Sequence, residues 1–192
     1  MKTILALSPH PDDIELGAGG FLLKQIQENN QVDIVYCYKE KVQEVEHCST
    51  IYNYNSIWLY NTSARPTHNA ESVKLLDNIM CSKQYTHLLI PHNGERHQDH
   101  KTVNNLAISS ARRFRGCVLQ YEVCEYTNDN YNFKPNIFVG IDDTIDQKMQ
   151  WANYFSDVDE NTLNTCKGLN ILRAKNTNQQ YAEAFELLKW SW

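Results

Sequence analysis

A loop with candidate metal-binding and catalytic side chains lies directly after an apolar segment near the start of the chain. Residues 8–20 read Ser-Pro-His-Pro-Asp-Asp-Ile-Glu-Leu-Gly-Ala-Gly-Gly. Prolines on both sides of His10 restrict the backbone and remove two amide donors, so this loop is stiff. Such a loop can direct the His10 imidazole and the Asp13 carboxylate at one cation, and Asp12 can then reach a water molecule on that cation. Zinc accepts both ligand types, at about 2.0–2.2 Å.

Two other interpretations of this loop are open. Asp12 and Asp13 could only cap the following helix, because carboxylates favour the positive end of the helix dipole. Gly17, Gly19 and Gly20 could belong to a dinucleotide-binding loop. However, they fall inside the expected helix and lack the GxGxxG spacing, so close packing of that helix is the expected role of these glycines. His10 between its prolines favours a metal half-site.

A second cluster follows another apolar segment, and it reads Pro91-His-Asn-Gly-Glu-Arg-His-Gln-Asp-His-Lys101. Asp99 stands between His97 and His100, and a carboxylate there can orient an imidazole and raise its basicity. If His100 joins the half-site of His10 and Asp13, the metal has three protein ligands and an open position. That is the arrangement of a catalytic zinc site.

Apolar segments alternate with helical patterns along the chain. The sequence predicts strands at 3–7, 32–38, 57–59, 87–90, 117–122 and 136–141, and helices at 15–28, 41–52, 70–82, 99–113, 144–155 and 179–190. Asp142 or Asp143 is expected to cap the helix over 144–155. This alternation indicates an α/β fold with a mostly parallel sheet and helices on both faces. Ligands of such sheets bind beyond the carboxyl ends of the strands, where both clusters are expected.

Length and composition narrow the class of protein. A chain of 192 residues fits one domain over 1–192. A net charge of -5 argues against a nucleic-acid partner, and no apolar stretch approaches the roughly 18 residues of a membrane helix. Six cysteines without a CxxC pair are typical of free thiols in a reducing compartment. We therefore expect a cytoplasmic protein without a membrane partner.

Together, the two clusters resemble the LmbE/PIG-L family of metal-dependent N-deacetylases. The matching motifs are Pro9-His10-Pro11-Asp12-Asp13, Gly17-Ala18-Gly19-Gly20 and His97-Gln98-Asp99-His100, followed near the C-terminus by Asp142-Asp143-Thr144-Ile145-Asp146-Gln147-Lys148, Arg173-Ala174 and Tyr181-Ala182-Glu183-Ala184-Phe185. The resemblance thus spans nearly the whole chain. It implies a Rossmann-like, three-layer α/β/α fold.

The resemblance also implies a reaction and roles for individual residues. His10, Asp13 and His100 would bind zinc, although ferrous iron suits the same donors. Asp12 would be the general base, and His97 the general acid or oxyanion stabiliser, oriented by Asp99. The implied activity is hydrolysis of an N-acetyl group on a small amino-sugar-type substrate, by a water molecule that the metal activates.

One segment departs from the family pattern and leaves the sugar open. Residues 38–46, after the second predicted strand, look shortened and lack an arginine that relatives use for their substrate. Arg65 or Arg96 could supply that cation, and His92 and Glu122 could line the pocket from strand ends. Four aromatic residues could stack on a sugar: Tyr121, Tyr126, Tyr131 and Trp151. A position in the core or at the rim is the commoner role of such residues.

Three rival functions use the same residues differently. The chain could be a deformylase or another amidase on a related amino-sugar conjugate, or a non-catalytic metal-dependent binding protein. The binding protein is disfavoured because a candidate base and acid accompany the ligands. A membrane-bound glycolipid deacetylase is disfavoured because no anchor helix is predicted. Self-association into a homo-oligomer is left open by the sequence.

Overall fold

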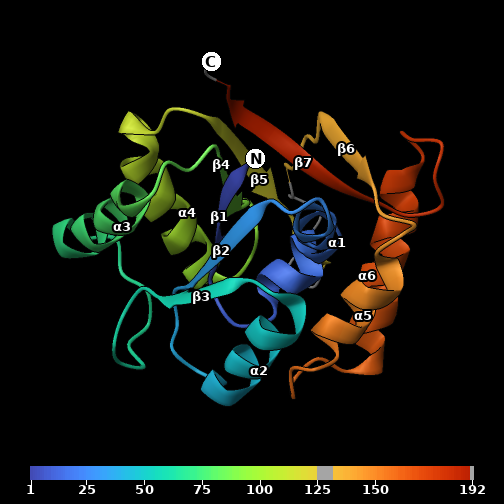
Figure 1. Cartoon of the computed structure of the whole chain (residues 1–192), viewed down its shortest axis with the longest axis horizontal. Helices are drawn as coiled ribbons and strands as arrows, with labels where there is room; N and C mark the ends of the chain where they lie inside the picture. Colours follow the sequence, from blue (N-terminus) through green and yellow to red (C-terminus); the bar gives the residue numbers. More distant parts are fainter. Residues whose placement is uncertain (125–131, 191–192) are drawn as a thin grey trace.

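The computed structural model describes residues 1–124 and 132–190, and within them the strands form one mixed sheet (Figure 1). The sheet order is β3-β2-β1-β4-β5-β7-β6. Its strands are β1 (Thr3–Ser8), β2 (Gln31–Tyr36), β3 (Asn55–Trp58), β4 (His87–Pro91), β5 (Cys117–Tyr121), β6 (Ile137–Gly140) and β7 (Ala182–Lys189). The first five strands pair in parallel, whereas β7 runs antiparallel to both β5 and β6.

Helices cover both faces of this sheet, which gives three layers. The helical segments are α1 (Asp13–Gln27), α2 (Val42–Tyr52), α3 (Ala70–Ser82), α4 (Gln98–Ser110), the 3-10 turn η1 (Ala111–Arg113), α5 (Ile145–Ala152) and α6 (Glu160–Ala174). Figure 1 shows α3 and α4 on one side of the sheet and α1, α5 and α6 on the other. The predicted α/β/α fold with a mostly parallel sheet is confirmed.

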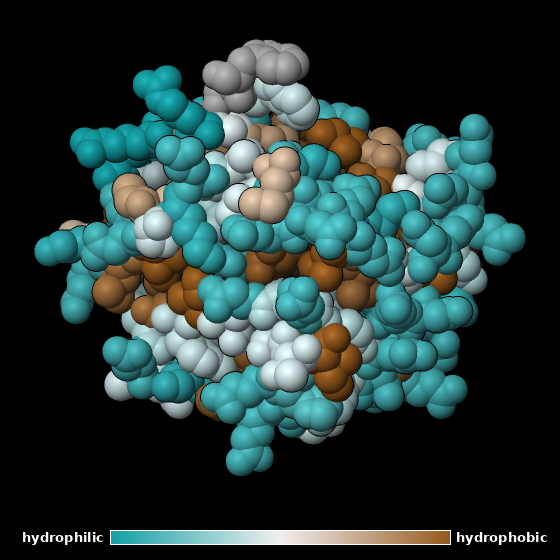
Figure 2. Space-filling model, viewed as in Figure 1, coloured by the Kyte–Doolittle hydropathy of each residue, from teal (hydrophilic) through white to brown (hydrophobic). Residues whose placement is uncertain are grey.

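Alternation along the strands divides the core into two apolar clusters. In β1, Ile4 and Ala6 belong to the cluster under α1, whereas Leu5 and Leu7 belong to the cluster under α3 and α4. Successive side chains of a strand point to opposite faces, so a strand that is buried on both faces is continuously apolar. On the outer surface, hydrophilic residues predominate in the view of Figure 2.

Two further predictions concern the cysteines and the helices. Five of the six cysteines are buried as free thiols, and Cys81 is exposed. Among the helices of residues 1–124 and 132–190, none combines the length and the apolar character that are needed to cross a membrane.

The C-terminal part of the chain differs from the prediction. The helix expected over 179–190 is wrong, because Ala182–Lys189 forms strand β7 between β5 and β6. Alanine, leucine and glutamate give this segment helix propensity, but ladder hydrogen bonds on both sides and burial of Phe185 override it.

Helix α6 is absent from the predicted elements, and its composition explains why. The residues that it buries are Thr162, Cys166, Asn170 and Ala174, which recur every four positions but are small or polar. Such a stripe has no apolar periodicity by which the sequence would indicate a helix. The Asp159 carboxylate begins the helix by accepting the backbone N–H of Thr162 at 2.7 Å.

The predicted cap of α5 is also wrong. The N-cap position of α5 is Thr144, not Asp142 or Asp143. The Asp142 carboxylate instead accepts the backbone N–H groups of Gln180 and Tyr181, at 3.0 and 2.7 Å. Asp142 therefore fixes the approach to β7. Residues 127–130, whose Thr-Asn-Asp-Asn sequence predicts a turn, lie outside the described residues.

The glycines of α1 allow close packing, as predicted. A Cβ atom on Gly17 would lie 2.3 Å from the ring of Tyr121 and 2.8 Å from the backbone oxygen of Glu122, so no side chain fits there. The backbone N–H groups of Gly20 and Phe21 donate to the Glu183 carboxylate at 2.8 and 2.7 Å. Helix α1 is therefore bound directly to strand β7.

Glu183 also forms an ion pair that has no access to solvent. Lys148 Nζ lies 2.8 Å from Glu183 Oε1 and donates to Asn170 Oδ1 at 2.9 Å, and both charged side chains are fully buried. Desolvation makes such a pair costly to form, but removing one partner leaves an uncompensated buried charge. The pair joins α1, α5, α6 and β7.

We expect Lys148→Met to lower the free energy of unfolding by about 3–5 kcal/mol, because Glu183 is left buried without its counter-charge. Urea denaturation measures this change. In the double variant Lys148→Met/Glu183→Gln the loss should be smaller than in Lys148→Met alone. A double variant that is less stable than both single variants would show that the charge balance is not the cause.

Candidate metal and catalytic site

Two loops far apart in the sequence meet at the carboxyl ends of neighbouring strands β1 and β4. Asp13 Oδ2 lies 3.1 Å from His10 Nδ1 and 3.1 Å from His100 Nε2. Ring nitrogens of His10, His97 and His100 lie within 4.8 Å of one another. Asp13 and His100 are buried. The structure therefore brings together the predicted ligands and places His97 beside them.

The loop after β1 is held by its own hydrogen bonds. Ser8 Oγ donates to the backbone oxygen of His10 at 2.6 Å and accepts the N–H of Ile14 at 3.1 Å. The N–H of His10 donates to Asp13 Oδ2 at 2.8 Å. These bonds fix the relative positions of His10 and Asp13 before any ligand binds.

Asp12 has a backbone conformation that L-residues rarely adopt, with φ at 118°. Its N–H donates to the Glu15 carboxylate at 3.1 Å, and Glu15 in turn accepts the hydroxyl of Tyr36 at 2.7 Å. The Asp12 carboxylate meets Lys41 Nζ at 2.8 Å. Strain at a site residue that is held on several sides is typical of functional positions.

Asp99 contacts a different histidine from the one predicted. Its carboxylate Oδ2 lies 3.0 Å from His10 Nε2, and it accepts a hydrogen bond from Arg65 at 2.8 Å. The contact with His97 is made by the backbone, since the N–H of Asp99 donates to His97 Nδ1 at 3.2 Å. The carboxylate of Asp99 therefore orients His10, while His97 is fixed as the N-cap residue of α4.

Glu95 is a site residue that the sequence analysis missed. Its carboxylate contacts His100 Nδ1 through one oxygen and accepts the N–H of Val123 at 2.9 Å through the other. Glu95 is fully buried. A carboxylate on the far nitrogen fixes the orientation of His100 and raises its basicity. The sequence signal that could have identified Glu95 is its position in the same loop, five residues before His100.

Burial and the charges of the site displace the pKa values of several groups, among them Asp12, Asp13 and His100. Burial and the neighbouring Asp13 charge raise the pKa of Asp12 to about 9, although Lys41 opposes them. Burial would raise the pKa of Asp13 as well, but the His100 charge and the hydrogen bonds of two imidazoles hold it well below its usual range. Burial alone would lower the pKa of His100, but Asp13 and Glu95 raise it to about 10.

These residues fit a divalent cation. A buried carboxylate oxygen within hydrogen-bond distance of two imidazole nitrogens is a donor set that suits zinc and ferrous iron. The raised pKa of His100 favours a protonated ring, which would balance the Asp13 charge. A cation bound by His10, Asp13 and His100 would replace that proton.

A cavity of about 220 Å³ opens over these residues. Its lining consists of His10, Asp12, Tyr38, Glu40, Arg65, His97, Asp157 and Val158. Lys41 connects two segments beside it, because Nζ donates to Asp12 and to the backbone oxygen of Pro11 at 3.1 Å in one loop and contacts the Asp157 carboxylate in the other. Lys41 and Asp157 were not predicted, because neither belongs to the two motifs.

Of the predicted substrate contacts, Arg65 lines this cavity, and the structure places the others elsewhere. Arg96 is exposed and is not among the lining residues. His92 is buried with its ring edge against Phe133. Glu122 is paired with Arg173 at 2.5 and 2.7 Å.

The aromatic residues proposed for sugar stacking are not at the cavity where the structure describes them. Tyr121 and Trp151 are fully buried core residues, and Tyr121 donates its hydroxyl to the backbone oxygen of Leu7 at 2.8 Å. Tyr126 and Tyr131 lie outside the described residues. Tyr38 is the aromatic residue that lines the cavity.

A comparison with protein families assigns the chain to a family. Residues 5–111, more than half of the sequence, match the PIG-L family, described as GlcNAc-PI de-N-acetylase. The chain therefore belongs to the PIG-L family. No curated protein sequence matches the chain significantly.

Solved structures share the whole fold at low sequence identity. The conserved protein TT1542 from Thermus thermophilus has a TM-score of 0.84 and 21% identity, over 100% of this chain and 97% of its own. N,N'-diacetylchitobiose deacetylase from Pyrococcus horikoshii has a TM-score of 0.80 and 21% identity, over 97% of this chain and 84% of its own. A 4-carboxy-2-hydroxymuconate hydratase from Pseudomonas putida has a TM-score of 0.81 and 15% identity, over 98% of this chain and 97% of its own. These likenesses establish the fold.

Proposed function

We propose that this protein is a zinc-dependent hydrolase that removes the N-acetyl group of a small amino-sugar-type substrate. The observation that carries the proposal is the convergence of His10, Asp13 and His100, with Asp12 and His97 beside them, at one cavity of a PIG-L chain. The deacetylase from Pyrococcus horikoshii, which has the same fold, supports this class of reaction.

His10, Asp13 and His100 would hold the metal ion. When bound, a divalent cation supplies Lewis-acid polarisation and makes hydroxide available near neutral pH. Asp99 and Glu95 hold two of these ligands through their second ring nitrogens. The chain thus orients the imidazoles before the cation arrives, which lowers the entropic cost of forming the site.

Asp12 and His97 have different roles: Asp12 transfers a proton, and His97 stabilises charge. Asp12 lines the cavity and would accept a proton from the attacking water in its ionised form. Burial and the Asp13 charge raise its pKa to about 9, so this role depends on the positive charge of Lys41 and of a bound cation to stabilise the ionised carboxylate. His97 is fixed through Nδ1 at the start of α4 and lines the same cavity. It stabilises the negative charge that develops on the acyl oxygen, an interaction typically worth about 3–4 kcal/mol.

The size and polarity of the cavity favour a small polar substrate. Its volume is about 220 Å³, and Glu40, Arg65 and Asp157 offer charged hydrogen-bonding groups around the mouth. Carboxylates accept the hydrogen bonds of sugar hydroxyls, and a guanidinium donates to their oxygens. Such a lining suits an amino sugar better than an apolar acyl chain.

A different acyl group or a related water addition is the main alternative. The hydratase from Pseudomonas putida has this fold, so the fold alone does not select hydrolysis of an amide. An assay over N-acetyl and N-formyl amino sugars, with acetate and formate quantified separately, distinguishes a deacetylase from a deformylase. The proposed function is contradicted if the protein turns over neither the N-acetyl nor the N-formyl amino sugars.

Asp12→Asn should retain the metal and lose about 10²–10⁴-fold in kcat, because the amide cannot accept the proton of water. Acetate release measures the activity, and elemental analysis measures the zinc content. His100→Ala is the matched control, and it should lose both metal and activity. An Asp12→Asn enzyme with nearly full turnover would refute the assignment of the base.

The affinity for zinc should rise by about tenfold per pH unit near neutrality, because binding displaces one proton from His100. The sign follows from the raised pKa of His100, about 10, since the ring of the metal-free protein is protonated below that pH. Calorimetric titrations in buffers of different ionisation enthalpy count the released protons. His97→Gln should keep the same slope. An affinity that is independent of pH would contradict the prediction.

Lys41→Met should reduce kcat by about tenfold or more with little change in KM, because Asp12 loses the cation that stabilises its ionised form. Lys41→Arg should restore part of the loss. Asp157→Asn serves as the control for kcat, since it leaves the contact between Lys41 and Asp12 in place; because Asp157 lines the cavity, the effect of this variant should fall on KM. A loss confined to KM would show that Lys41 acts on substrate binding instead.

A further inference from the structure

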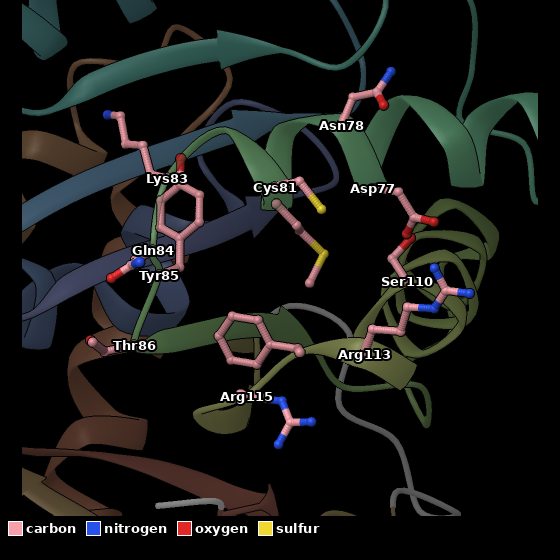
Figure 3. A pocket seen from close by; sticks show the side chains of 12 residues that line it. Asp77, Asn78, Cys81, Lys83, Gln84, Tyr85, Thr86, Ser110, Arg113 and Arg115 are labelled. Carbon is pink, nitrogen blue, oxygen red and sulfur yellow. The ribbon is translucent and has the colours of Figure 1, made fainter.

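A second and larger cavity lies between the end of α3, the start of β4 and the junction of η1 with β5 (Figure 3). Its volume is about 630 Å³. Small-molecule sites commonly have volumes of about 300–1,000 Å³. This cavity opens at the amino-terminal ends of β4 and β5, whereas the candidate site follows the carboxyl ends of β1 and β4. The two cavities share no lining residue.

The floor of this cavity is apolar and partly aromatic. Met80, Tyr85 and Phe114 line it, and each is less than one tenth exposed. The Tyr85 hydroxyl is already engaged, because it donates to Asp33 Oδ2 at 2.6 Å. Gly116 lets Phe114 pack closely, since a Cβ atom on Gly116 would lie 2.9 Å from the Phe114 ring. The cavity therefore offers ring surface rather than hydrogen-bonding groups at its base.

The rim is cationic, in a protein whose net charge is -5. Arg113 and Arg115 line the cavity and are exposed, and neither has an ion-pair partner among residues 1–124 and 132–190. Asp77, the carboxylate of the lining, is paired with Arg112 at 2.9 Å. Figure 3 shows Arg113 and Arg115 at the border of the hollow that Cys81 and Tyr85 also surround. The unpaired positive charge makes the cavity attractive to anions.

We propose that this cavity binds a small organic anion with a flat apolar body, of the aromatic carboxylate class. The ring of the ligand would pack on Tyr85 and Phe114. Its carboxylate would accept paired hydrogen bonds from Arg113 or Arg115, because a guanidinium matches the geometry of a carboxylate. The proposal is independent of the deacetylase function, since it uses none of the residues of the metal site.

Cys81 provides a reporter inside the cavity. It lines the cavity and is exposed, whereas the five other cysteines are buried. Dithiobis-nitrobenzoate, an aromatic disulfide with carboxylates, serves as the probe, and dithiodipyridine is its neutral counterpart. The Cys81 thiolate attacks the disulfide of the probe, a mixed disulfide forms, and one aromatic thiolate leaves while the thiol proton goes to solvent. The released thiolate or its thione absorbs light, so the rate is measured directly.

We expect the reaction of Cys81 with the anionic probe to saturate as the probe concentration rises, which indicates binding before reaction. The preference for the anionic over the neutral probe should fall by about tenfold in Arg113→Gln/Arg115→Gln. The matched control is Lys134→Gln/Lys175→Gln, which removes the same charge from exposed positions outside the cavity. That control should keep the preference.

Protection by a second ligand completes the experiment. Naphthoate should slow the reaction of Cys81 with dithiodipyridine in the wild-type protein and not in Arg113→Gln/Arg115→Gln, whereas acetate should protect neither. Thermal melting of each variant confirms that the fold is intact. A rate that stays linear in the anionic probe, equal loss of preference in the lysine control, or no protection by naphthoate would each overturn the proposal.

Discussion

The candidate site depends on one shared carboxylate. Asp13 stands between an imidazole from the loop after β1 and an imidazole from the start of α4, and a single oxygen approaches both rings. Because Asp13 is buried, its negative charge needs a positive charge close by. That positive charge, whether a proton on an imidazole or a metal ion, must lie between the two loops. The same electrostatic demand therefore brings the loops together and creates a place for a cation.

The charged groups around Asp13 balance one another and hold the two imidazoles in place. Asp99 and Glu95 contact the second nitrogens of His10 and His100, and Lys41 offsets the charge of Asp12. Several acids can coexist in this small volume because His10 and His100 each bridge two carboxylates, and Arg65 and Lys41 add positive charge. The strained backbone of Asp12 is then the cost of directing two adjacent carboxylates to different partners.

Much of this arrangement follows from the sequence because it rests on local patterns. The apolar strands β1 and β4, each followed by a histidine-containing loop, placed both loops at one edge of the sheet, and the stiff Pro9–Pro11 segment indicated a fixed pair of ligands. The partner of Asp99 could not be predicted in this way. Whether its carboxylate turns toward His97 or His10 depends on how the start of α4 faces the loop after β1, which is a tertiary property.

The C-terminal half shows the limits of pattern more clearly. Ala182–Lys189 has the composition of a helix but forms a strand, and α6 is a helix in a segment for which the sequence predicted no element. In both cases partners distant in sequence decide the outcome. Glu183 binds the backbone of α1 and the ammonium of Lys148, and Asn170 donates to the backbone oxygen of Ala182 at 3.1 Å. Local propensity is weak against such contacts.

The position of β7 in the sheet has a consequence for how the protein is made. Strand β7 is inserted between β5 and β6, although it follows both in the sequence. During synthesis, β5 and β6 therefore leave the ribosome without the neighbour that each will finally pair with, and their edges stay open until the last strand emerges. A nascent chain of this topology depends on delayed closure. Slow translation of Ala182–Lys189 would prolong the interval in which these edges can pair with another chain.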